Sequence, residues 1–421
     1  MGSARRVVFL GMCLVWSGVA GLLGCEGDGS LDVSVEERVA IPGDRVRWRR
    51  PGEAMGPVQR EGDAATLPPM EAPAVWRPLS DPPPARPRLF PTVTATPTGV
   101  LLFGGVVGRF PLADPWRWDG QRWYPVAAQG APAGRTAHLA AATPAGACIW
   151  GGRGPSGLLD DGACWDAARD RWEPTPRAGA PSPRADAMGA WDGRALVLFG
   201  GIDREGESLG DAYGLVPGAE GWAALPEGPR ARHRGLLAPA TGRLGRVDEG
   251  LVLVGGAGEA LALGAEDAAR WTPNPGRWTD LDREGVPSAS EGPVYLATES
   301  GPVVLGESAA ARFDRLSGRW EPLPTEAMPP LRLGASALAV PGALIVWGGR
   351  DIHGDQGSGA VYDAATRRWI ALPPGPPPRR DAVLLESGGR VLLLWGQDDG
   401  GLRDDAWELD LEALRSAEPR P

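Results

Sequence analysis

Few residues in this chain have the types and spacing that catalysis requires. The 421-residue sequence contains three histidines, His138, His233 and His353, and no two of them are close in sequence. It contains no HExxH, GxSxG, Walker or CxxC motif, so the familiar signatures of hydrolases, nucleotide sites and thiol redox sites are missing. We expect His138 and His233 to be structural or solvated. Asp351, His353 and Asp355 cluster in the segment RDIHGDQG, where a weak metal site and a polar loop are alternatives. We favour the loop and predict no metal and no cofactor.

Arginines recur in similar surroundings along the chain, in the motifs APAGRTAH, SPRADA, ARHRGLL, PLRLGAS and PPRRDAV. Arg88 precedes this series, and two further arginines directly follow glycine pairs. A guanidinium fork can bind both oxygens of a carboxylate. These arginines therefore either form a ring that binds an anionic ligand or pair with aspartates of the protein itself. The candidate ligand-binding residues are Arg135, Arg153, Arg184, Arg234, Arg332, Arg350 and Arg380, with Arg379 beside the last of them.

The two cysteines of the predicted folded body are Cys148 and Cys164, and they flank one predicted hairpin. A disulfide can join neighbouring antiparallel strands in an oxidising compartment. Two buried thiols on inward faces are the alternative, and the sequence leaves both open.

The elements that position these residues repeat. An apolar run that ends in a glycine pair occurs five times, and two weaker copies end in a single glycine. The copies end at Gly104-Gly105, Gly151-Gly152, Gly200-Gly201, Gly255-Gly256, Gly306, Gly348-Gly349 and Gly396. The first or only glycines of successive copies lie 42 to 55 residues apart, and recurrence at such a period is typical of repeat architectures. Each glycine pair is expected to end the second strand of a unit, where the chain must turn without a Cβ clash.

A series of tryptophans alternates with the glycines, each at the start of a short β segment. Its members are Trp76, Trp123, Trp172, Trp222, Trp278, Trp320 and Trp369. Each unit has four β segments separated by Gly, Pro and Asp turns, as expected for one four-stranded blade. In the second unit the segments are His138 to Ala142, Ala147 to Trp150, Ala163 to Asp166 and Arg171 to Pro174. We expect each tryptophan to pack between adjacent blades.

The order of glycine pair, aromatic residue and tryptophan resembles the kelch repeat over about Ala74 to Leu411. The pattern predicts an all-β protein, a kelch-type β-propeller with seven four-stranded blades. Trp76 precedes the first glycine pair, and no further tryptophan follows Trp407, so the seventh unit lacks its own outer strand. We predict that the N-terminal strand around Trp76 closes the ring. Closure removes an exposed sheet edge that would otherwise favour aggregation.

Three classes of function follow from the resemblance. Ligand-binding kelch proteins hold acidic peptides at similar arginine positions, which implies a binding face here for a protein, a glycan or an anionic ligand. Some kelch propellers are copper radical oxidases, which require a tyrosine linked to a cysteine. Neither Cys148 nor Cys164 lies in a matching motif. The alternatives to a binding module are an enzyme, such as a sugar-acid isomerase or an oxidase-like propeller, and a structural envelope protein.

The N-terminus has the pattern of an export signal. Arg5 and Arg6 precede an apolar stretch that is short for a membrane span. The stretch ends in LLGC at Cys25, which resembles the lipobox of bacterial lipoproteins and implies lipidation of that cysteine. An ordinary cleaved signal peptide and an uncleaved anchor are the alternatives. Glu26, by the same resemblance, implies the outer membrane. We therefore expect a lipid-anchored protein of the cell envelope, either periplasmic or surface-exposed.

Composition adds two limits. A net charge of −10 without a basic block excludes a nucleic-acid partner. The 18 tryptophans argue against a disordered chain, although 62 Gly and 44 Pro make up about a quarter of it. We divide the chain into a signal peptide (residues 1–25), a flexible tether (26–73), the propeller (74–411) and a C-terminal tail (412–421).

Overall fold

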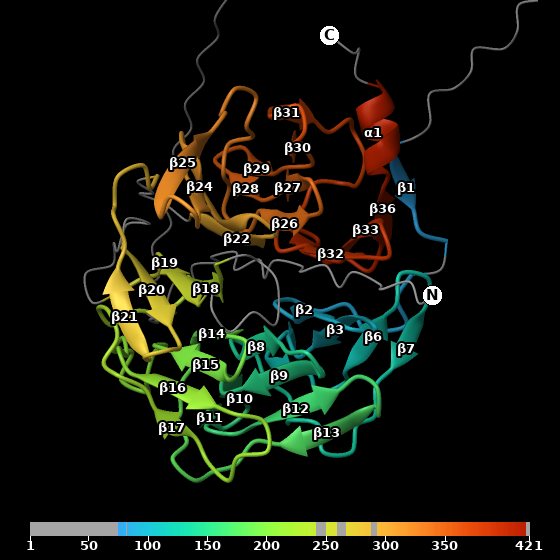
Figure 1. Ribbon diagram of the computed structural model, residues 1–421. Coiled ribbons are helices and arrows are strands. Elements are labelled where there is room, and N and C mark those ends of the chain that lie inside the picture. Colours follow the sequence, from blue (N-terminus) through green and yellow to red (C-terminus); the bar gives the residue numbers. More distant parts are fainter. Residues whose placement is uncertain (1–74, 81, 241–249, 259–266, 288–292, 418–421) are drawn as a thin grey trace, which may run out of the picture. The chain divides into compact units, whose positions relative to one another are not determined.

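The computed structural model in Figure 1 contains seven four-stranded antiparallel sheets arranged in a ring. It describes residues 75–80, 82–240, 250–258, 267–287 and 293–417. The predicted signal peptide and tether, including Cys25, lie outside the described residues. The predicted fold class is confirmed: the protein is an all-β propeller with seven blades. Within the described segments no helix is both long and apolar enough to cross a membrane.

The four strands of each blade follow one order, and we number the blades 1 to 7 by their first strands. The first strands are β2 (Thr92–Thr96), β8 (Leu139–Ala142), β14 (Met188–Trp191), β18 (Leu236–Pro239), β22 (Val294–Thr298), β26 (Ser336–Val340) and β32 (Val383–Ser387). The second strands are β3 (Gly99–Phe103), β9 (Gly146–Trp150), β15 (Leu196–Phe199), β19 (Leu251–Val254), β23 (Gly301–Leu305), β27 (Ala343–Trp347) and β33 (Arg390–Leu394). First strands of neighbouring blades contact one another, so they surround the centre of the ring.

The outer half of each blade completes the sheet. The third strands are β6 (Trp116–Trp118), β12 (Gly162–Asp166), β16 (Ala212–Leu215), β20 (Ala268–Thr272), β24 (Ala310–Asp314), β30 (Gly359–Asp363) and β36 (Ala406–Leu409). The fourth strands are β7 (Trp123–Pro125), β13 (Arg171–Pro174), β17 (Ala223–Ala224), β21 (Arg277–Asp280), β25 (Arg319–Leu323), β31 (Arg368–Ala371) and β1 (Trp76–Pro78). In blade 2 the observed strands differ from the predicted segments by one residue at most. His138 therefore precedes the first strand rather than beginning it.

Blade 7 takes its fourth strand from the N-terminal end of the described chain. β1 pairs antiparallel with β36, and Trp76 lies opposite Leu409. A continuous core of buried residues joins blades 6, 7 and 1, including Ile345, Leu392 and Leu102. This pairing is the arrangement that closure of the ring by the N-terminal strand requires. Helix α1 (Leu411–Ala417) follows β36.

Among the residues that the structure describes, four blades carry an additional hairpin between the second and third strands. The hairpins are β4 (Val106–Val107) with β5 (Phe110–Pro111), β10 (Arg153–Gly154) with β11 (Gly157–Leu158), β28 (Arg350–Asp351) with β29 (Gly354–Asp355), and β34 (Gln397–Asp398) with β35 (Gly401–Leu402). They follow the ends of second strands, which is also where first strands begin, since the two strands are antiparallel. We call this end of the propeller the hairpin face.

Aromatic residues on the outer and second strands join neighbouring blades. Trp172 of blade 2 packs on Phe103 of blade 1, with ring centroids 5.8 Å apart. The Trp222 ring lies 5.7 Å from Trp150, in the same relation one blade further on. The aromatic residue before a glycine pair therefore contacts the outer tryptophan of the next blade. The predicted packing of these tryptophans between blades is confirmed.

Candidate functional site

In the described part of the chain, five arginines on the hairpin face are fully or almost fully buried, and each pairs with an aspartate of its own blade. The residues are Arg88, Arg135, Arg184, Arg232 and Arg379, none more than 2% exposed. We call them the clasp arginines. Their aspartate partners are Asp114, Asp161, Asp211, Asp267 and Asp405, which come shortly before or at the start of the third strand of the same blade. The alternative in which arginines pair with the blades' own aspartates therefore describes this group.

Arg184 shows the contacts of a clasp in detail. Its Nη1 and Nη2 donate to the two carboxylate oxygens of Asp211 over 2.5 and 2.9 Å. Nη1 also donates to the carbonyl of Gly200 over 3.1 Å, and Nε donates to the carbonyl of Ser182 over 3.0 Å. Burial raises the pKa of Asp211, but the hydrogen bond and charge of Arg184 outweigh it and hold that pKa below its usual value. Arg184 thus fastens the first, second and third strands of blade 3 together.

The glycine pairs and the clasp arginines also join each blade to the next. The N–H of Gly152 donates to the carbonyl of Arg184, and the N–H of Arg184 donates to the carbonyl of Leu159. A Cβ on Gly151 would lie 2.9 Å from the Arg184 carbonyl oxygen, a distance that requires a shift of the backbone. The pair therefore provides more than a turn, because it lets the backbone of the following blade approach closely.

In two blades the clasp arginine is not the candidate ligand-binding arginine of that blade. In blade 4 the clasp is Arg232 rather than Arg234, and in blade 7 it is Arg379 rather than Arg380. A spacing signal was available: Arg88, Arg135 and Arg184 each stand 16 residues before the first glycine of their blade. Arg379 has the same spacing to Trp395, which takes the first glycine position of blade 7 with a φ of 54°.

The residue two places after each clasp arginine has a positive φ, and these residues are linked from blade to blade. Asp186 donates its N–H to the carbonyl of Ala137, and Arg234 donates its N–H to the carbonyl of Asp186. The φ values of the three residues lie between 52° and 60°, a conformation that is uncommon outside glycine. The Arg234 guanidinium also pairs with the Asp186 carboxylate over 3.1 Å. Arg234 of blade 4 is thus already paired with a carboxylate of blade 3.

The remaining candidate arginines are not equivalent. Arg332 has an 11% exposed side chain and pairs with Asp351 over 3.3 Å. Arg153 is exposed and makes no ion pair with any residue in the described ranges. Blade 5, where the sequence SASEGP breaks the arginine series, has residues 288–292 outside the described part. The seven candidates therefore divide into two buried clasps, Arg135 and Arg184, and five residues with exposed or partly exposed side chains.

A second ion-pair cluster connects the hairpins of blades 6 and 7. Arg380 donates to the buried carboxylate of Asp355 over 2.7 and 2.8 Å, and Arg350 lies 3.3 Å from the same carboxylate. Arg350 also binds both oxygens of Asp399, with N–O distances of 2.6 and 3.2 Å. We call these four residues the Arg–Asp network. The side chain of Asp355 is 7% exposed, whereas that of Asp399 is 75% exposed.

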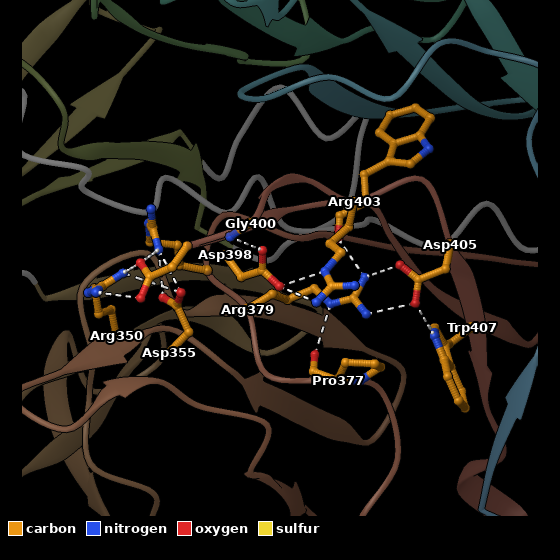
Figure 2. A network of polar contacts seen from close by, with 12 residues as sticks. Arg350, Asp355, Pro377, Arg379, Asp398, Gly400, Arg403, Asp405 and Trp407 are labelled. Atoms are coloured by element: carbon orange, nitrogen blue, oxygen red, sulfur yellow. Dashed lines mark hydrogen bonds and ion pairs between the residues drawn. The ribbon is translucent and has the colours of Figure 1, made fainter.

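Figure 2 shows Arg350 and Asp355 of this network beside the blade 7 clasp, where Arg379 contacts Pro377 and Asp405. The Asp398 carboxylate binds Arg403 in the same view. The charged groups of the segment RDIHGDQG and of the adjacent segments therefore pair with other residues of the protein. Asp351 accepts hydrogen bonds from the His353 N–H and from Gln356. Among the residues that the structure describes, no group of three or more His, Cys, Asp or Glu is arranged to hold a metal ion.

Exposed apolar side chains lie on the same sector of the hairpin face as the Arg–Asp network. Eight large hydrophobic residues are exposed in the described part of the chain, and five of them lie on the hairpin face of blades 6, 7 and 1. We call these five the apolar rim: Leu333, Ile352, Leu402, Phe90 and Phe110. Ile352 is 94% exposed and Phe110 is 67% exposed. Blades 6, 7 and 1 are consecutive in the ring, so one sector of the hairpin face combines arginines with exposed apolar groups.

The other two histidines are enclosed. His138 is 5% exposed, and its Nε2 lies 2.8 Å from the Thr92 hydroxyl oxygen. Burial, with a smaller contribution from the charge of Arg135, lowers the pKa of His138 to about 3. His233 contacts the hydroxyl of Ser208, and burial lowers its pKa as well. His138 is therefore neutral at physiological pH.

Cys148 and Cys164 lie opposite each other on β9 and β12. The structure joins them by a disulfide between these antiparallel strands, with a sequence separation of 16 residues. The bond lies within blade 2 and connects its inner and outer halves.

Comparison with known proteins gave no family for this chain. No model of a protein family matches it, and no curated protein matches it significantly. The functional argument therefore depends on the geometry of the site.

Proposed function

We propose that this protein is a binding module whose site is the hairpin face of blades 6, 7 and 1. The observation that carries the proposal is the combination of partly exposed arginines, Arg350 and Arg380, with the exposed apolar rim on one sector of one face. A contiguous exposed apolar area rimmed by polar residues is typical of interaction sites. Arginine is enriched at protein interfaces together with large apolar side chains.

The ligand class that suits this site is anionic. Arginine forks bind carboxylates in a two-pronged geometry, and Arg350 already binds Asp399 in that way. The buried clasps Arg135 and Arg184 support the scaffold in this proposal, while Arg350 and Arg380 of the Arg–Asp network contact the ligand.

We further propose that the propeller is of the kelch type and acts in the cell envelope. The glycine pairs, the outer tryptophans and their contacts between blades support the kelch assignment. The lipobox pattern at Cys25 supports a lipid anchor in the membrane, with Glu26 favouring the outer membrane. Several acyl chains hold a protein on a membrane firmly. Metabolic labelling with palmitate, compared with the Cys25→Ser variant, tests the anchor, and loss of label only in the variant is expected.

A binding array tests the module. The protein is applied to immobilised acidic peptides, neutral peptides and glycans, and the Arg350→Gln and Arg153→Gln variants are compared. Arg153 is the control because it is exposed on the hairpin face of blade 2 and lies outside the Arg–Asp network. We expect binding to acidic members and at least a tenfold loss for Arg350→Gln, with little change for Arg153→Gln. Equal binding by both variants contradicts the proposed site.

A further inference from the structure

Asp399 differs from Asp355, the other carboxylate of the Arg–Asp network, because its side chain is exposed to solvent. It lies in the turn of the hairpin β34–β35, between Asp398 and Gly401. Its side chain is 75% exposed, and its two oxygens bind Arg350 while Arg380 lies 3.9 Å away. The contact crosses from blade 7 to the blade 6 hairpin that carries Arg350. A two-pronged arginine–carboxylate pair is thus formed in solvent, between two blades, at the site where an anionic ligand is proposed to bind.

The two arginines do not depend on Asp399 for their position. Asp355 is buried and contacts both Arg350 and Arg380. Its carboxylate would therefore continue to hold the two guanidiniums if Asp399 moved away. Preorganised arginines lower the entropy cost of binding a ligand. The site would then be ready for a second carboxylate.

We infer that Asp399 is an internal stand-in for a ligand carboxylate, and that an acidic ligand displaces it from Arg350. This inference rests on the proposed binding function and adds the regulation of that site. Surface ion pairs contribute only about 0–1 kcal/mol, so displacement of Asp399 is easy. Asp399 acts as a weak competitor that lowers the apparent affinity for any ligand whose carboxylate binds Arg350.

The surroundings of Asp399 also indicate the chemistry of the ligand. Ile352 is 94% exposed at the tip of the blade 6 hairpin, and Leu402 is 39% exposed on the blade 7 hairpin. Leu333, at the entry to blade 6, is 47% exposed. A protein segment in which an acidic residue is flanked by bulky apolar residues would replace the Asp399 carboxylate and cover these side chains. A carboxylated glycan offers the charge without the apolar groups, so we assign the site to a peptide segment.

The test measures binding of fluorescein-labelled decapeptides that combine glutamate with leucine or phenylalanine, by fluorescence polarisation with the full-length protein in detergent. The paired state of Arg350 and Asp399 is favoured over the unpaired state by about 0–1 kcal/mol. Removal of the pair should therefore tighten peptide binding by about two- to sixfold. We expect this gain for Asp399→Asn. The matched control is Asp404→Asn, which removes the same charge from the same exposed segment, where Asp404 makes no ion pair with a described residue. We expect little change for the control.

The outcomes separate the inference from the function on which it rests. Equal gains for both variants indicate a general charge effect and overturn the stand-in role, while leaving the binding function intact. A gain for Asp399→Asn that persists when Arg350 is replaced by Gln also overturns it. Preference for uronic-acid glycans over the peptides overturns the ligand class. No binding by the wild type or by either variant overturns both the inference and the proposed function.

Discussion

Replacement of Arg184 by Met separates a structural role of the clasp arginines from a role in ligand binding. Arg184 is fully buried, and its guanidinium contacts Asp211, Gly200 and Ser182. Methionine keeps the unbranched apolar stem but removes every donor. Removal of one partner of a buried ion pair costs about 3–5 kcal/mol. Asp211 is 41% exposed and regains contact with water, so we expect the lower end, about 3 kcal/mol of unfolding free energy.

The assay is urea unfolding followed by tryptophan fluorescence. Arg184→Met should lower the urea midpoint with an unchanged slope, because the surface exposed on unfolding is the same. The control is Arg153→Met, which removes an exposed arginine and should change the unfolding free energy by no more than about 0.5 kcal/mol. Peptide binding by folded Arg184→Met should match the wild type. An unchanged midpoint, or equal destabilisation by the two variants, would refute the clasp.

Three further predictions concern closure, the disulfide and acid stability. Deletion of residues 70–80 removes the fourth strand of blade 7, and we expect aggregation in light scattering; a monomer with unchanged melting temperature contradicts closure by the N-terminal strand. Alkylation of the unfolded protein without reductant should add no mass at Cys148 and Cys164, and reduction should lower the unfolding free energy by about 3 kcal/mol; addition of two alkyl groups contradicts the disulfide. The unfolded chain protonates His138 with an ordinary pKa near 6.5, whereas the folded protein does so only near a pKa of about 3. Stability is therefore lost as the pH falls below about 6.5, and between pH 7.5 and 5 the wild type should lose about 2 kcal/mol more than His138→Gln in urea titrations; parallel pH profiles would show that His138 does not titrate as described.

The repeats allowed most of the fold to be predicted because a blade is built from short-range features. Strands, turns and glycine pairs recur within each unit, and their hydrophobic pattern depends on a few neighbouring residues. The predicted strands of blade 2 agree with β8, β9, β12 and β13 to within one residue. The missing outer strand of the seventh unit was also visible in the sequence as a displaced tryptophan, Trp76.

The candidate site could be predicted only in outline. The arginine motifs located the hairpin face, but not which arginines are buried. Arg232 and Arg234 are two residues apart, so simple strand alternation would place them on the same side. Arg234 has a φ of 60°, and this left-handed conformation breaks the alternation. Arg232 is therefore a buried clasp, while the side chain of Arg234 is 32% exposed.

The sequence by itself determined the propeller, the number of blades and the face on which arginines gather, since the glycine motif recurs seven times and arginine motifs precede most of its copies. Only the tertiary structure decided which arginines are buried and which pair with another blade. Asp211 lies 27 residues after Arg184 within one blade, and three other clasp pairs have a spacing of 26 residues. Asp399 lies 49 residues after Arg350 on a different blade. That pair forms because the ring brings loops of two blades together at one end, and no repeated spacing in the sequence records it.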